Sequence, residues 1–101
     1  MKKPLLMTAL KNRFKKVGNY ECHLKNININ GVKRGCSGFI KNPETEKIIY
    51  LTTEYVCGNC YKPLENKVMF RTAKDFKDYT GGTNQWCMEN ELVDKVVKAL
   101  A

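Results

Sequence analysis

The sequence predicts an α+β domain, an antiparallel meander of about four strands with an N-terminal and a C-terminal helix packed on one face. Three observations favour this class. Apolar residues recur at helical spacing near both ends of the chain, alternating apolar and polar residues fill its middle, and an Asn-Gly pair divides two of the alternating runs. Since no repeat, linker or low-complexity tract interrupts the pattern, residues 1–101 are expected to form a single globular domain.

A first helix is expected over residues 4–17. Pro4 suits a first helical turn, and Gly18 is suited to a left-handed C-terminal cap. On the side away from the core, Lys11 and Lys15 lie one turn apart, which makes this a basic amphipathic helix. Its apolar stripe recurs at spacings of three and four: Leu6, Leu10, Phe14 and Val17.

Two strands joined by a tight turn are expected next, over residues 20–29 and 32–40. The turn is Asn30-Gly31, a pair that tolerates the positive φ angles of a type I′ hairpin. The apolar parity changes between Leu24 and Ile27, which predicts a bulge near residues 25–26.

The remaining elements are two strands and a helix. Residues 47–53 are β-branched and aromatic, residues 55–63 form a break, and residues 67–72 form the fourth strand. Residues 74–85 are polar and are expected to be a loop. The last helix spans residues 88–100, with one apolar stripe: Leu92, Val93, Val96, Val97 and Leu100.

The charge of the chain is strongly positive and unevenly distributed. It has 18 Lys and Arg residues against 10 Asp and Glu residues, a formal net charge of +8. Residues 1–41 hold ten of the basic residues and one acid, Glu21. A one-sided positive field attracts polyanions, so nucleic acid is the first partner expected and an acidic protein the second. Because no apolar stretch is long enough to cross a bilayer, we expect no membrane partner and a cytoplasmic location.

The first functional hypothesis is a small, basic, non-enzymatic accessory protein that binds nucleic acid and prefers single strands. In the polar loop, basic residues interleave with Phe76, Tyr79 and Trp86, the chemistry of sequence-tolerant strand binding, although Asp75 and Asp78 offset part of the charge. The lysine- and asparagine-rich composition is typical of short phage or mobile-element chains. The residues expected to bind nucleic acid are Lys11, Arg13, Lys15, Lys16, Lys25, Lys33, Arg34, Arg71, Lys74, Lys77 and Tyr79.

The alternative hypothesis is a small protein-binding module that inhibits or completes a larger enzyme. A chain of this size can present one interface of standard area but hardly an active site as well. The same positive charge would complement an acidic protein, so charge does not separate the two hypotheses. The aromatic residues of the loop, Phe76 and Trp86, would then be core anchors or contacts for the partner.

The five cysteines give a third hypothesis, a small domain stabilised by zinc. Their odd number is not that of a disulfide framework. Cys57 and Cys60 form a CxxC pair with a glycine inside it, a spacing that lets two thiolates bind one zinc ion. The two further zinc ligands would have to come singly from Cys22, His23, Cys36 and Cys87. If no zinc is bound, the cysteines are free thiols.

An enzyme is not expected. The single histidine, His23, follows Cys22 on a predicted strand, where neighbouring side chains point to opposite faces and cannot form a nucleophile–base pair. The acidic pairs lie in turns or at a helix start, where acids serve capping and solubility. The chain has no Walker motif and no GxGxxG, so neither a cofactor other than zinc nor a small-molecule substrate is expected.

Overall fold

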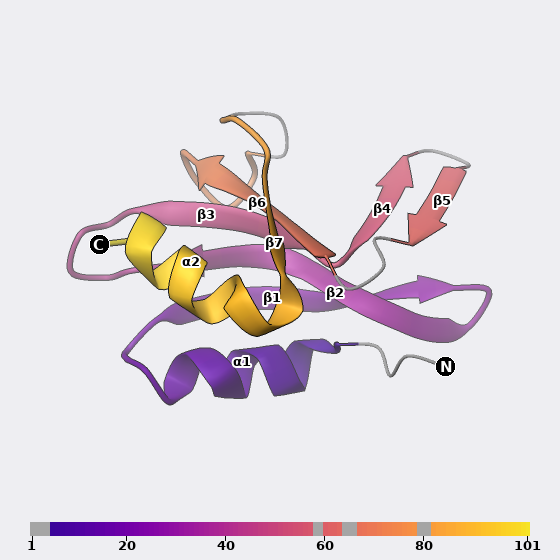
Figure 1. Cartoon of the computed structure of the whole chain (residues 1–101), viewed down its shortest axis with the longest axis horizontal. Coiled ribbons are helices and arrows are strands. Elements are labelled where there is room, and N and C mark those ends of the chain that lie inside the picture. The colour runs from indigo at the N-terminus through magenta and orange to yellow at the C-terminus, as the bar shows by residue number, and fades with distance from the viewer. Residues whose placement is uncertain (1–4, 58–59, 64–66, 79–81) are drawn as a thin grey trace.

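The computed structural model describes residues 5–57, 60–63, 67–78 and 82–101, and only the backbone for residues 55–57 and 60–63. A main antiparallel sheet has the strand order β1-β2-β3-β6-β7. The predicted α+β class is confirmed, with five strands in this sheet instead of about four. Figure 1 shows these elements: α1 (Met7–Lys15), β1 (Glu21–Ile29), β2 (Val32–Lys41), β3 (Ile48–Thr52), β4 (Glu54–Cys57), β5 (Cys60–Pro63), β6 (Lys67–Ala73), β7 (Gln85–Met88), the 3-10 turn Glu89–Glu91 and α2 (Leu92–Ala99).

One buried cluster joins both helices to the main sheet. Leu10 and Phe14 of α1 and Val96 of α2 belong to it and are fully buried. Because side chains alternate along a strand, its sheet residues all lie on one face, and the residues between them point to the other face. The sheet residues of the core cluster are Cys36, Ile40, Ile49, Leu51, Val68, Phe70 and Cys87.

The first helix is shorter than predicted. It runs over Met7–Lys15, and Val17, expected on the apolar stripe, is 53% exposed beyond its end. The backbone N–H of Met7 donates to the Asn26 side-chain oxygen at 2.9 Å, so β1 supplies a partner for the first helical turn. Gly18 does not have a positive φ, so the left-handed cap predicted there is wrong. Pro4 lies outside the described residues.

The turn between β1 and β2 confirms the hairpin signal. Asn30 has φ 53° and Gly31 has φ 79°, as a type I′ turn requires, and Ile29 pairs with Val32 across it. The bulge lies between Ile27 and Asn28, two residues later than the parity change predicted. From Glu21 to Ile27 the pairing is regular, which fixes the face to which each β1 side chain points.

Two parts of the fold, the separate two-stranded sheet β4-β5 and strand β7, were not expected from the sequence. The predicted break over residues 55–63 contains the hairpin of β4 and β5, paired from Glu54 with Pro63 to Cys57 with Cys60. Strand β7, which pairs with β6, takes the place between the predicted loop, which ended at residue 85, and the predicted helix, which began at residue 88. The helix α2 therefore begins four residues later than predicted, at Leu92, after a short 3-10 turn. Four-residue strands carry too little periodicity to stand out from a polar context. Within the described residues, neither helix has the length and apolar content needed to cross a bilayer.

Candidate nucleic-acid interface

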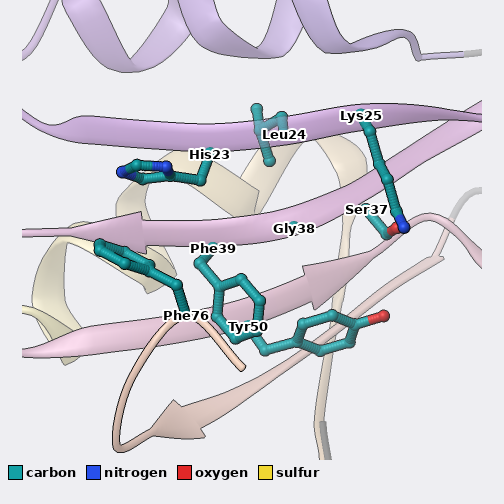
Figure 2. Close-up of a pocket in the computed structure, with 8 residues that line it drawn as sticks. All are labelled: His23, Leu24, Lys25, Ser37, Gly38, Phe39, Tyr50 and Phe76. Carbon is teal, nitrogen blue, oxygen red and sulfur yellow. The ribbon is translucent and has the colours of Figure 1, made fainter. Parts of the chain in front are cut away.

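A groove of about 360 Å³ lies on the sheet face that points away from the core cluster. The regular pairing of β1, β2 and β3 brings its residues together, and the turn after β6 supplies Phe76 (Figure 2). Phe39 is buried but does not belong to the core cluster, as expected for a residue on the other face. The lining residues are His23, Leu24, Lys25, Ser37, Gly38, Phe39, Tyr50 and Phe76.

Aromatic rings form one wall and one end of the groove. His23, Phe39 and Tyr50 are directly paired across β1, β2 and β3. The Phe39 and Tyr50 ring centroids are 5.2 Å apart in an edge-on arrangement. Figure 2 shows the His23 ring facing that of Phe76, with centroids 4.0 Å apart and planes inclined by 35°. Such contacts hold the rings in fixed positions, so the groove is formed before any ligand arrives.

The rings differ in their exposure to solvent. The Phe39 side chain is buried and forms the floor, while Tyr50 and Phe76 are half-buried. The His23 side chain is 44% exposed, and its Nε2 lies 2.8 Å from a Glu21 carboxylate oxygen, which fixes the imidazole plane. The rim therefore offers ring surface to a flat ligand.

Lysines stand at both ends of the groove. Lys25 lies beside Ser37 at the end away from the His23 ring (Figure 2). At the other end the Lys41 Nζ is 6.0 Å from the centroid of the Phe76 ring. Two exposed lysines, Lys74 and Lys77, lie within two residues of Phe76. An anion chain that crosses the groove would meet positive charge on entering and on leaving.

The acids in the turn after β6 accept hydrogen bonds from the backbone of that turn. Asp75 accepts the backbone N–H of Lys77 at 2.8 Å, and Asp78 accepts that of Lys74 at 3.0 Å. These carboxylates shape the turn that carries Phe76. Their hydrogen bonds keep both carboxylates at the turn.

The structure distributes the N-terminal basic residues over three places. Lys25 lies at the groove. Lys33 and Arg34 are exposed near the tip of the β1–β2 hairpin. The others are exposed on or just after α1, the helix whose apolar side enters the core cluster: Lys11, Arg13, Lys15 and Lys16. Of the N-terminal candidates, the structure brings Lys25 to the aromatic rings.

The candidate residues in the second half of the chain, Arg71, Lys74 and Lys77, also differ in their exposure. Lys74 and Lys77 are exposed, whereas the Arg71 side chain is only 3% exposed. Its guanidinium carbon lies 4.7 Å from the Tyr50 ring centroid, and its Nη2 donates to the Asp78 carbonyl oxygen at 2.9 Å. The Arg71 guanidinium therefore contacts other groups of the protein. Tyr79 lies outside the described residues.

The CxxC pair lies at the β4–β5 hairpin, where Cys57 and Cys60 are paired across the two strands, and their side chains lie outside the described part. Cys36 and Cys87 belong to the core cluster, and His23 points to the opposite sheet face. Within the described residues, no three His, Cys, Asp or Glu side chains gather as a metal site would require. Zinc binding at the CxxC pair stays a prediction.

Burial raises the pKa of the three described thiols. It raises the pKa of Cys36 to about 12, with a further contribution from the negative charge of Glu89. The pKa of Cys87 is raised by burial and by Glu91. At Cys22 burial also raises the pKa, against the opposing positive charge of Lys11 and Lys15.

This shift predicts a loss of stability in alkali. Because the folded pKa of Cys36 lies above its ordinary value of 9.0, its contribution is complete below about pH 9 and is lost as the pH rises toward 12. Between about pH 8 and pH 10 the free energy of unfolding should fall by about 1.4 kcal/mol from this thiol. Urea unfolding at both pH values measures the fall. The Cys36→Ala variant should lose less stability over the same interval, and an equal loss would contradict the prediction.

A second hollow, of about 430 Å³, lies between the α1–β1 connection and the β2–β3 turn. Its lining includes Tyr20, Asn42 and Glu44 but no lysine or arginine among the described residues. None of these lining residues carries a positive charge, so the groove is the better candidate for a polyanion.

Sequence reasoning assigned no role in nucleic-acid binding to His23, Phe39 or Lys41. Strand parity did give a signal for His23. Cys22 and Leu24 have core parity, which places His23 and Lys25 on the other face of the sheet. The sequence did not show that the turn after β6 folds back to place Phe76 on His23. Comparison with protein-family models, with curated proteins and with solved structures found no match.

Proposed function

We propose that this protein is a small, basic, non-enzymatic accessory protein that binds nucleic acid, with a preference for single strands, at the groove of its main sheet. The observation that carries the proposal is the groove itself, lined by aromatic rings and flanked by Lys25 and Lys41. Rings stack on bases whatever the sequence, and lysines follow the phosphates. In a duplex the base faces are covered by stacking and only the edges are exposed, so a ring-lined groove favours single strands.

A row of paired residues extends the same sheet face to its far edge. Directly paired residues of antiparallel strands share a face, so Trp86 of β7 lies on the same side of the sheet as the groove. Trp86 is 53% exposed and is the only tryptophan of the chain. The row consists of Lys25, Ser37, Thr52, Met69 and Trp86.

The test is a titration of labelled single-stranded and duplex oligonucleotides, followed by fluorescence anisotropy at several salt concentrations. A strand that contacts the four lysines near the groove should give a slope of log K against log salt of about −3. The single strand should bind more tightly than the duplex, and Trp86 emission should change on binding. Equal affinity for the two forms would contradict the strand preference, and the absence of binding at low salt would contradict the function.

The second candidate function is a protein-binding module, and one observation favours it. Trp86 and Met88 are 53% and 42% exposed on β7, the last strand in the order of the main sheet. Exposed aromatic and methionine side chains on a strand that is last in the order of the described sheet suit a protein partner. A complex that survives nuclease and high salt in a pull-down, together with no oligonucleotide binding, would favour this second function.

A further inference from the structure

Arg71 is a buried cation that contacts the turn carrying Phe76, and its Nη1 also donates to the Thr72 carbonyl oxygen of its own strand at 3.4 Å. Its Nη2 donates to the Asp78 carbonyl oxygen at 2.9 Å, and its Nη1 lies 4.0 Å from an Asp78 carboxylate oxygen. The guanidinium also covers the Tyr50 ring, 4.7 Å from its centroid. A buried guanidinium is stable only with partners, so the Arg71 charge and the position of Asp78 depend on each other.

The turn between Lys74 and Asp78 connects the Arg71–Asp78 contact to the groove. Its carboxylates bond to backbone N–H groups inside the turn, as described above, and the Asp78 N–H donates to the Asp75 carbonyl oxygen at 3.4 Å. A turn closed in this way moves as one piece. Phe76 projects from its middle onto His23, at 4.0 Å, and onto Phe39, at 6.0 Å. Fixing Asp78 therefore fixes the ring at the end of the groove.

We infer that Arg71 is a positioning residue: through Asp78 it holds Phe76 on His23 and keeps the groove preformed for one unpaired base of a nucleic-acid strand. This inference rests on the proposed function and names the part of the ligand that the groove receives. With about 360 Å³, the groove lies at the lower end of the range of small-molecule sites, roughly 300–1,000 Å³, which fits one base and not a base pair in its stack. The lysines at its ends would meet the phosphates on either side of that base.

Loss of a positioning residue and loss of a phosphate contact change the salt slope and the affinity in different ways. Loss of a phosphate contact brings the slope of log K against log salt closer to zero by about 0.7 for a single strand and weakens all strands alike. Loss of a positioning residue weakens only the part of binding that comes from stacking, which does not depend on salt. A strand without bases separates the two, because it keeps every phosphate and has nothing to stack.

The experiment compares the wild type with Arg71→Met, Phe76→Leu and the double variant, on a single strand with bases and on an abasic strand of equal length. We expect Arg71→Met to weaken binding of the strand with bases roughly 5- to 100-fold, the loss of one stacked base. The salt slope and the affinity for the abasic strand should stay unchanged. Phe76→Leu should give a similar loss, and the double variant should lose little more than either single variant, since both act through one ring.

Several results would overturn the inference. These are a salt slope closer to zero by about 0.7 in Arg71→Met, losses that multiply in the double variant, or a wild type that binds the abasic strand as tightly as the strand with bases. All of them leave nucleic-acid binding intact. Failure of every strand to bind at low salt would overturn the proposed function as well. Circular dichroism checks folding, and if Arg71→Met does not fold, Phe76→Leu on the two strands decides the question alone.

Discussion

Reversing the charge of Lys25 and Lys77 should weaken binding of a single strand about a hundredfold at about 0.1 M salt, whereas reversing Lys11 and Lys15 should cost about threefold or less. All four lysines are exposed. Lys25 lines the groove and Lys77 follows Phe76, so the first pair would face the phosphates of a bound strand. Lys11 and Lys15 lie on α1, away from the groove face, and act on the strand only through a field that salt screens over about 10 Å.

The two double variants, Lys25→Glu/Lys77→Glu and Lys11→Glu/Lys15→Glu, change the net charge by the same amount and serve as each other's control. Anisotropy titrations at low and moderate salt measure both. The groove variant should also have a salt slope closer to zero by about 1.5, because two phosphate contacts are lost from a single strand. Equal losses in the two variants would show that total charge, and not the groove, determines binding.

The sequence predicts the charge of this protein well but not its placement. Lysines on a helix and lysines on a sheet contribute equally to composition, and the basic residues of the first half lie on α1, at a hairpin tip and at the groove. Only strand parity distinguishes them, because Lys25 must lie opposite the face to which Leu24 contributes. Arg71 shows the limit of this reasoning. Its parity was readable, but its burial depends on a turn that folds back over it.

Local signals were sufficient where one residue pair decides the conformation. Asn30-Gly31 fixed a hairpin because both residues accept positive φ angles. The helices were recognised by periodicity, with errors of a few residues at their ends, where packing decides. β7 was missed because four residues pair with β6 through backbone groups that every sequence has. Its strand character comes from its neighbour in the fold.

Among the described glycines, Gly38 is a position where a single added methyl group should do great harm. It lies in β2 opposite Leu24 and has φ +150°, a conformation that L side chains rarely adopt. A Cβ at this position would lie 2.8 Å from the Leu24 Cα and 2.9 Å from the His23 carbonyl carbon, and it would also meet the His23 oxygen. These are backbone atoms of β1, so no side chain can rotate away, and the two strands must separate.

Gly38→Ala should therefore lower the free energy of unfolding by about 3 kcal/mol or more, from backbone strain and overpacking together. Gly31→Ala is the matched control, because Gly31 also has a positive φ, +79°, but nothing lies within 4 Å of its added Cβ. It should cost only about 1–2 kcal/mol. Urea unfolding of both variants measures the difference. Since β1 carries His23 and Lys25, folded Gly38→Ala should also bind single strands more weakly than Gly31→Ala. Equal stability and equal affinity of the two variants would contradict this account of the groove.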